Sequence, residues 1–269
     1  MIRVINLDSV SCVRDGNVIL DNLNFDIEKG SFVSVIGSNG SGKSTLVKVL
    51  AGIFEYNGYI NINGYSLNNS NIGEIRKKVS VVLDDMDNMF IGETVCDELA
   101  VSLNNLGEDE LYIGKRVMEV ARLFEIEDIL NKSVMDITNS QRQKVFIAEA
   151  LMSYPDIVII DDCMHQLCTY DKKLVFKILN KYKKEKKLTI IMVSHDMEDV
   201  INSDRVIVMN KGRVAMDGSA VSVFKEKDKL FKLGIKVPFV IELSLRLMDK
   251  GIVNHVYLDM RKLVDDIWK

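Results

Sequence analysis

Nine consecutive residues near the N-terminus have the types and spacing of a phosphate-binding loop. They are Gly37, Ser38, Asn39, Gly40, Ser41, Gly42, Lys43, Ser44 and Thr45. Glycines let the backbone curl so that its N–H groups point at phosphate oxygens, and a helix that starts within the loop adds further donors and a positive dipole end. Lys43 supplies a cation for β- and γ-phosphates, and the Ser44 hydroxyl is a ligand for Mg²⁺. The segment therefore predicts a nucleotide phosphate site.

Two consecutive carboxylates, Asp161 and Asp162, follow the apolar run Ile157–Ile160. In nucleotide hydrolases, the first acid after such a strand holds Mg²⁺, here Asp161. The second, Asp162, would orient or deprotonate the attacking water. His195 follows the next apolar run, and we expect it to sense the γ-phosphate, although a lone histidine is more often structural. With the phosphate loop, these residues predict nucleotide hydrolysis.

Apolar runs and helical patterns alternate along the chain and must position these residues. The predicted buried strands are Phe32–Ile36, Val79–Leu83, Ile157–Ile160, Leu188–Val193 and Val206–Met209, and the predicted helices are Lys43–Ala51, Gly114–Phe124, Gln141–Met152 and Lys172–Lys181. Buried strands separated by helices predict a largely parallel sheet covered on both faces, which is the α/β class. Tyr59–Tyr65 alternates apolar and polar residues and contains Asn63-Gly64, which predicts an antiparallel strand leading into a turn.

The chain divides into a main domain and a C-terminal segment. No low-complexity linker interrupts residues 1–224, which we assign to one domain, and the part from about 90 to 150 is rich in helical patterns and poor in strand patterns. A charged stretch follows Phe224, so residues 225–269 are assigned to an appended segment. An amphipathic helix is predicted near Val240–Leu247.

The predicted C-terminal helix carries apolar residues at helical spacing: Leu243, Leu247 and Met248. Such a face favours pairing with a second subunit. The alternative is that the face packs only on its own domain.

Composition limits the compartment and the partners. The 269-residue chain has a net charge of −4, which does not favour nucleic acid as a partner. Its four cysteines lack the spacing of a disulfide framework, and the N-terminus lacks the pattern of a signal peptide, so we expect a reducing cytoplasm. No apolar stretch reaches the roughly 18 residues that cross a bilayer. Any membrane role would therefore depend on a partner.

In this order and spacing, the three elements resemble the ATP-binding-cassette ATPases. Gln141–Val145 and Ala148 look like the helix that follows the family's signature loop. Asp87–Val95 and the C-terminal stretches Leu233–Val240, Glu242-Leu243 and Gly251-Ile252 are similar to the energy-coupling-factor transporter ATPases. The resemblance implies a P-loop NTPase fold of the cassette type, with an antiparallel β subdomain, an inserted helical subdomain and a small C-terminal appendage.

The resemblance also implies a function and a set of partners. Members of this group bind and hydrolyse ATP with Mg²⁺ to power importers of vitamins or transition-metal ions. They work at the cytoplasmic face of the membrane as two ATPase subunits joined to an integral membrane coupling protein and a substrate-binding membrane protein. The groove near Asp84–Val95 would pass the motion to the membrane. The resemblance implies no role in binding nucleic acid.

The chain departs from the family at the signature loop, which reads Leu-Ser-Gly-Gly-Gln in the family. Here the aligned residues are Ile137, Thr138, Asn139, Ser140 and Gln141. In the family this loop contacts the γ-phosphate of a nucleotide bound to the opposite subunit, so Thr138 to Gln141 are nucleotide-contacting candidates. We expect the side chains of Asn139 and Ser140 to occupy the space that the glycines leave open.

Four further positions depart from the family pattern. Asp84 stands at the glutamine-loop position, beside phosphate and metal, and Cys168 stands where an aspartate is expected. Asp162 replaces the catalytic glutamate, which withdraws the carboxylate by about 1.5 Å. A displacement of that size can cost about 10²-fold in rate. Arg14 replaces the aromatic residue that stacks on adenine, and a guanidinium can also stack.

These departures leave two functions open, an ATPase subunit of an importer and a nucleotide-binding regulatory subunit that hydrolyses little itself. They also favour a heterodimer, because an intact partner would place the defects of this chain in separate composite sites. A zinc site at Cys163, His165 and Cys168 is a weaker alternative, since no fourth ligand is evident.

Overall fold

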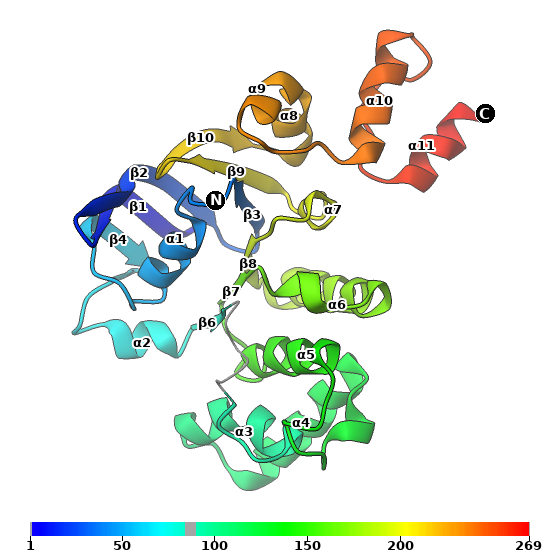
Figure 1. Cartoon of the computed structure of the whole chain (residues 1–269). Coiled ribbons are helices and arrows are strands. Elements are labelled where there is room, and N and C mark those ends of the chain that lie inside the picture. The colour runs from blue at the N-terminus through cyan, green and yellow to red at the C-terminus, as the bar shows by residue number, and fades with distance from the viewer. Residues whose placement is uncertain (1, 84–89, 269) are drawn as a thin grey trace.

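A six-stranded sheet forms the centre of the computed structural model, which describes residues 2–83 and 90–268 (Figure 1). Its strand order is β10-β9-β3-β8-β7-β6. The strands are β3 (Phe32–Gly37), β6 (Val79–Val82), β7 (Ile157–Asp161), β8 (Thr189–Val193), β9 (Arg205–Asn210) and β10 (Arg213–Gly218). The five predicted strands are confirmed, and they run parallel. The edge strand β10, which the apolar pattern did not reveal, pairs antiparallel with β9.

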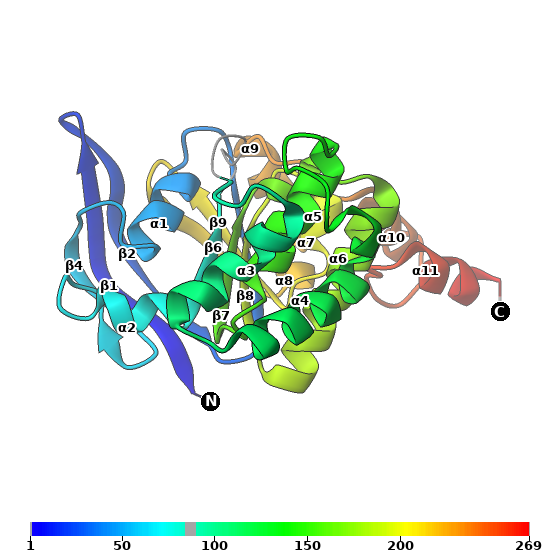
Figure 2. The same cartoon turned by 90° about the horizontal axis from the view of Figure 1, so that it is seen from below.

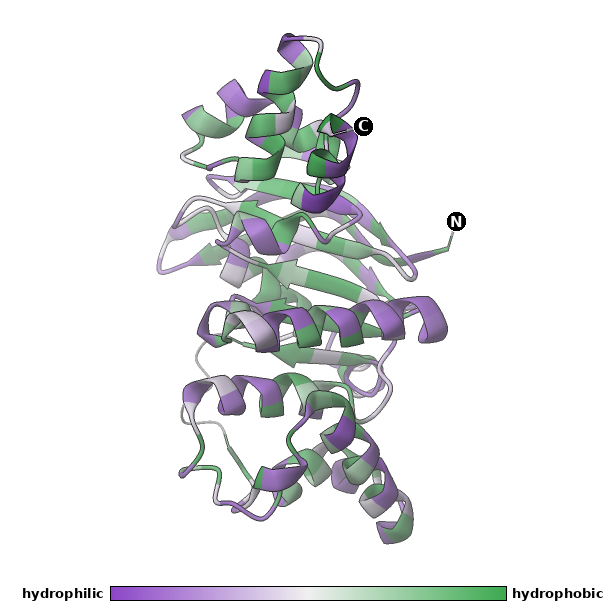
Figure 3. Ribbon diagram, turned by 90° about the vertical axis from the view of Figure 1, so that its right-hand side faces the viewer, coloured by the Kyte–Doolittle hydropathy of each residue, from purple (hydrophilic) through white to green (hydrophobic). Residues whose placement is uncertain are grey.

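Alternate residues of the central strands enter different apolar clusters on the two faces of the sheet. Val158 and Ile160 of β7 pack into the cluster formed with the helices α3 to α6, whereas Ile157 and Ile159 pack against α1 and the second sheet. All five residues of β7 are buried. Figure 3 shows the resulting band of hydrophobic strands between helices. Burial on both faces explains why these strands appear as continuous apolar runs in the sequence.

The second sheet is antiparallel and has the order β2-β1-β4-β5. Its strands are β1 (Arg3–Arg14), β2 (Asn17–Glu28), β4 (Asn57–Ile62) and β5 (Tyr65–Ser66). The predicted turn at Asn63-Gly64 joins β4 to β5, and both turn residues have positive φ. The long hairpin of β1 and β2, seen at the left of Figure 2, turns at Asp15-Gly16.

Helices cover the sheet and form a cluster inserted between β6 and β7. The helices of the first 200 residues are α1 (Lys43–Leu50), α2 (Ile72–Arg76), α3 (Val95–Leu106), α4 (Glu110–Phe124), α5 (Asn139–Ala150), α6 (Thr169–Lys186) and α7 (Met197–Val200), with short 3₁₀ turns η1 (Glu127–Ile129) and η2 (Cys163–Gln166). The four predicted helices correspond to α1, α4, α5 and α6. The expected helix-rich insertion contains α3 to α5 (Figure 1).

The described part of the C-terminal segment folds into three helices, α9 (Lys227–Lys232), α10 (Phe239–Asp249) and α11 (Met260–Ile267), and α8 (Ala220–Lys225) lies at its boundary with the main domain. Leu230, Ile241 and Leu263 share one apolar cluster with Ile36 and Val208 of the central sheet. Part of the C-terminal apolar surface therefore packs on the main domain. The division at residue 225 stays a prediction. Among the described residues, no helix is both long and apolar enough to span a bilayer.

Candidate active site

The phosphate loop connects the centre of the sheet to α1, because β3 ends at Gly37 and α1 begins at Lys43. A side chain at Gly37 would place its Cβ 2.4 Å from the Met209 carbonyl oxygen, and one at Gly42, where φ is 103°, would place it 3.0 Å from the Ile19 carbonyl oxygen. The neighbouring strands leave room for glycine alone at these two turns. No side chain caps the N-terminus of α1. The backbone N–H groups of its first turn are thus available to an anion.

Lys43 is a buried cation at the centre of this loop, with only 5% of its surface exposed. Its Nζ donates hydrogen bonds to the carbonyls of Gly37 (2.9 Å) and Ser38 (3.1 Å). Burial lowers the pKa of Lys43, and the carboxylates of Asp162 and Asp161 oppose that shift. The loop therefore holds its cation in place at the edge where both acids lie.

Asp161 lies at the carboxyl end of β7, two strands from the phosphate loop, and is 2% exposed. Its Oδ1 accepts a hydrogen bond of 3.4 Å from the Ser44 hydroxyl. Because parallel strands bring their carboxyl ends to one edge of the sheet, residues separated by more than a hundred positions meet there. A hydroxyl beside a carboxylate is a donor set that suits Mg²⁺.

Asp162 and His195 face each other at the same edge. The Asp162 carboxylate lies 3.7 Å from His195 Nε2 and accepts a 3.3 Å hydrogen bond from the His195 backbone N–H. Asp162 has a φ of 50°, a left-handed conformation that aspartate tolerates better than most residues. The structure thus brings Lys43, Ser44, Asp161, Asp162 and His195 together. This arrangement can hold a metal-bound phosphate and an attacking water.

The residues of the altered signature, Thr138 to Gln141, lie apart from this group. Thr138 caps α5 in a reciprocal capping box with Gln141. Asn139 is exposed, whereas the Ser140 hydroxyl is directed at Asp171 of the same chain, 2.6 Å away. Within the described parts of the chain, no hydrogen bond or ion pair joins residues 137–141 to residues 37–45. Of the two residues that stand at glycine positions, Asn139 therefore presents its side chain at the surface, whereas the Ser140 side chain is bonded within the chain.

Arg14 lies at the end of β1 with its guanidinium 4.2 Å above the ring of Phe54. Lys48 of α1 lies 5.4 Å from the same ring. A guanidinium that stacks on one aromatic face keeps its second face available for a flat ligand such as a nucleotide base. Phe54 was not evident from the sequence, because its only signal is its proximity to Arg14 in the fold.

Two other predictions concern Asp84 and a zinc site at Cys163, His165 and Cys168. Asp84 lies outside the described residues. Cys163 is buried with its sulfur 3.0 Å from the Asp161 carbonyl, while Cys168 caps α6 by accepting from the Asp171 N–H. Within residues 2–83 and 90–268, no group of three His, Cys, Asp or Glu side chains could hold a metal ion. The geometry does not support the zinc interpretation.

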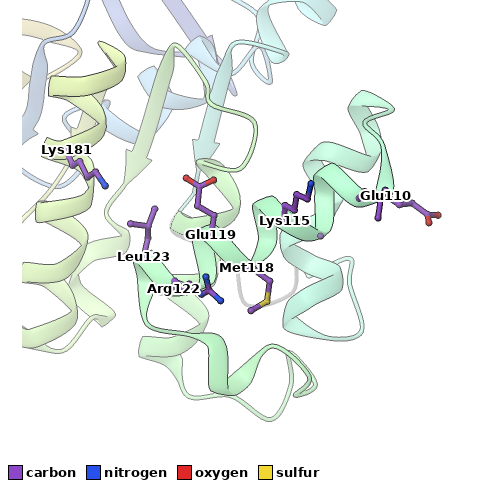
Figure 4. Close-up of a pocket in the computed structure, with 9 residues that line it drawn as sticks. Glu110, Lys115, Met118, Glu119, Arg122, Leu123 and Lys181 are labelled. Carbon is purple, nitrogen blue, oxygen red and sulfur yellow. The ribbon is translucent and has the colours of Figure 1, made fainter.

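A separate hollow lies on the outer surface of the inserted helices (Figure 4). Most of its lining comes from α4, including Lys115, Met118 and Arg122, and Lys181 of α6 borders it. It contains none of the predicted nucleotide or metal residues. The candidate site is therefore the sheet edge at Lys43 and Asp161.

Sequence reasoning missed the residues that hold the site in shape. Lys172 donates to Asp196 (2.8 Å) and Asp199 (3.2 Å), next to His195. Burial raises the pKa of Asp199, and the Lys172 charge opposes that shift. Gly212 donates its N–H to the Ser41 carbonyl (3.0 Å), which fixes the loop to the turn between β9 and β10. None of these contacts has a local motif that could have revealed it.

Comparisons with known proteins show which proteins this chain resembles. The family model described as ABC transporter matches residues 20–165. The energy-coupling factor transporter ATP-binding protein EcfA1 of Geobacillus kaustophilus is 32% identical over 251 residues, which cover 93% of this chain and 90% of that protein. The energy-coupling factor transporter ATP-binding protein EcfA of Pediococcus pentosaceus is 36% identical over 242 residues, covering 90% and 86%.

A solved structure gives the same result for the fold. The structure of cbiO1 from Clostridium perfringens, described as part of the ABC transporter complex cbiONQ, aligns with a TM-score of 0.76 and 28% identity. The alignment covers 93% of this chain and 97% of that chain. Because the part of this chain outside the alignment is shorter than the stretch from α8 to α11, the alignment includes at least some of the C-terminal helices.

Proposed function

This chain belongs to the ABC transporter family, and within that family we propose that it is an ATP-binding subunit that powers an energy-coupling factor type importer of vitamins or transition-metal ions. Its substrate is ATP with Mg²⁺. Ser38 to Thr45 would hold the phosphates, Ser44 and Asp161 the metal ion, and Asp162 with His195 the attacking water. Arg14 would support the base. Asp84 remains a candidate from the sequence alone.

The observation that carries the proposal is the buried Lys43 beside the Ser44–Asp161 contact. A lysine that is 5% exposed needs a functional or structural reason, since burial of an ammonium is costly. Here the loop carbonyls hold the Nζ beside an uncapped helix N-terminus, and two acids lie opposite. A polyphosphate with its metal ion satisfies all three features at once.

We propose a second ATPase subunit as partner, and the position of the signature residues supports it. Thr138, Asn139 and Gln141 lie at the start of α5 and make no contact with the phosphate loop of their own chain within the described residues. We propose that they face the nucleotide of a partner subunit. A heterodimer with a less altered partner would separate Asp162 from the altered signature, so that each composite site carries one defect instead of two.

The membrane partner would dock beside the inserted helices. A surface depression there is lined by Phe90, Thr94, Val134 and Met135, among others, and Met135 is 65% exposed. Phe90 stacks on Phe146 of α5 with ring centroids 4.2 Å apart. A membrane coupling protein seated in this depression would therefore contact a segment that packs directly on the helix of the altered signature. The chain would then lie peripherally at the cytoplasmic face of the membrane.

The alternative is a regulatory subunit that binds ATP and hydrolyses little. The short side chain of Asp162 and the exposed Asn139 at a glycine position favour it. The two functions differ in turnover, not in binding. Phosphate release by the full complex with its ATPase and membrane partners separates them, because a regulatory subunit would leave the turnover of the complex unchanged when Asp162 is replaced by asparagine.

Lys43→Ala tests the phosphate site itself. We expect MgATP affinity to fall by at least about 10²-fold, because charge-assisted hydrogen bonds to two phosphates are lost. Isothermal calorimetry with Mg²⁺ measures the effect, and Lys115→Ala, an exposed lysine on α4, is the matched control. Equal affinities for MgATP in the Lys43→Ala variant and the unmodified chain would contradict the proposed function.

A further inference from the structure

Ser140, which stands at a glycine position of the signature, makes contacts that a glycine could not make. Its hydroxyl donates to Asp171 Oδ2 at 2.6 Å and accepts a 3.3 Å hydrogen bond from the Cys168 N–H. Asp171 lies in the first turn of α6, and Cys168 is the residue that caps it. The start of α5 is therefore bonded to the start of α6, which directly follows the loop after Asp162.

A buried ion pair reinforces this contact. Lys144 of α5 lies 3.0 Å from Asp171, and the two side chains are only 9% and 11% exposed. Burial alone would raise the pKa of Asp171, but the hydrogen bond from Ser140 and the Lys144 ammonium outweigh it, so its pKa is lowered. A third contact joins Gln143 to Gln166 at 3.1 Å. Three neighbouring residues of α5 thus fix the segment that leads from Asp162 to α6.

Lys172, the residue after Asp171 in α6, contacts the loop that carries His195. Lys172 pairs with Asp196 and Asp199, which border His195. The first turn of α6 therefore contacts the signature end of α5 through Asp171 and the His195 loop through Lys172. Helices α5 and α6 lie side by side in both Figure 1 and Figure 2. A displacement of Asp162 or His195 can therefore reach Thr138 and Asn139 through consecutive hydrogen bonds and ion pairs of the first turn of α6.

We propose that Ser140 and Asp171 form a latch that couples the nucleotide site of this chain to the signature surface that it offers to the partner's nucleotide. Ser140 is then a positioning residue. The presence of serine in place of the family glycine reduces backbone access at the signature, but it also couples the signature to the nucleotide site of the same chain. The latch includes the Ser140 hydroxyl, the Asp171 carboxylate and the Cys168 N–H. The inference rests on the proposed nucleotide site.

Cys168 supplies a direct readout, because it is exposed and its own backbone N–H belongs to the latch. The rate of alkylation of Cys168 by a maleimide can be followed by peptide mass spectrometry, apart from the buried Cys12 and Cys163. In the unmodified chain, MgATP should change this rate. The measurement uses the full chain at a concentration where sedimentation shows a monomer, so that pairing does not protect the thiol.

Ser140→Ala removes the latch hydroxyl. We expect the Cys168 alkylation rate without nucleotide to rise on the order of tenfold, the factor that matches loss of one hydrogen bond to a charged group. We also expect that MgATP no longer changes the Cys168 alkylation rate in this variant. Ser140→Thr keeps a hydroxyl and should restore the nucleotide effect. Ser219→Ala removes a capping serine on the distant α8 and is the matched control.

Calorimetry on the same samples separates the two proposals. If MgATP binds and the Cys168 rate responds to it equally in the unmodified chain and the Ser140→Ala variant, the latch is wrong and the nucleotide site stands. If the unmodified chain binds no MgATP, the proposed function fails and the latch fails with it. Ser140→Gly, which restores the family residue, repeats the test should the alanine variant not fold.

Discussion

Glu149, on the inner side of α5, should make the chain less stable as pH rises. Burial and the nearby Glu98 carboxylate raise the pKa of Glu149 from 4.5 to about 7. Glu98 is itself 4% exposed and accepts hydrogen bonds from the N–H groups of Ile91 (2.9 Å) and Gly92 (2.8 Å). The folded chain thus holds a proton on Glu149 that the unfolded chain releases above pH 4.5.

The size of the effect follows from the two pKa values. A proton held more tightly by the folded state stabilises it below pH 4.5, and this stabilisation is lost as pH rises through about 7. At about 1.4 kcal/mol per pH unit, the loss amounts to about 3 to 4 kcal/mol. Glu149→Gln keeps the shape and removes the charge. The variant should therefore be more stable than the unmodified chain at pH 8 by about 3 to 4 kcal/mol, with little difference near pH 4.5.

Urea unfolding at pH 5, 6.5 and 8 measures this difference, with Glu108→Gln as the control. Glu108 is an exposed glutamate that follows α3, so its replacement should shift the unfolding midpoint little at any pH. A Glu149→Gln midpoint equal to that of the unmodified chain at pH 8 would refute the reasoning. An advantage of the same size at pH 5 and pH 8 would also refute it, because the gain would then come from packing and not from charge.

Two more predictions concern turnover and assembly. Asn139→Gly, Ser140→Gly and Asp162→Glu together should raise ATP turnover of the isolated chain by about 10²-fold if it pairs with itself, since they restore backbone access and carboxylate reach; steady-state phosphate release measures this, and unchanged turnover in a dimer counts against it. Phe239→Ser with Trp268→Ser, which are 66% and 84% exposed, should weaken pairing with a second ATPase about tenfold and spare MgATP binding. Sedimentation of the two subunits together measures this pairing. Truncation after Phe224 is a poorer test, because it would expose Ile36 and Val208 of the central sheet.

The parts of the fold that could be predicted are those with a local sequence signal. Buried parallel strands such as β7 are continuous apolar runs, and they were predicted nearly to the residue. The hairpin of β1 and β2 was missed, although its Asp15-Gly16 turn is a recognisable signal. Its residues alternate and carry charges because one face is exposed, so the apolar pattern is weak.

The residues of the candidate site also divide into those with a local sequence signal and those without one. Ser38 to Thr45 form one short segment whose chemistry can be read from residue types alone. The contact between Ser140 and Asp171 joins positions 31 residues apart, and Lys43 is held by carbonyls that have no sequence signal. The sequence identified Ser140 as a departure from a motif and as a nucleotide-contacting candidate. Its role as a hydrogen-bonding partner depends on how α5 and α6 pack.

The central position of β3 has a consequence for the order of events during synthesis. Both edges of β3 are hydrogen-bonded to strands from the far end of the chain, β8 and β9, and the Phe32 N–H is bonded to Asp204, 172 residues later. At translation rates of about 5–20 residues per second, the loop sequence emerges on the order of 10 to 30 s before its flanking strands. A nascent chain therefore carries the phosphate-binding segment well before it has a phosphate site, and nucleotide can stabilise only the nearly complete domain.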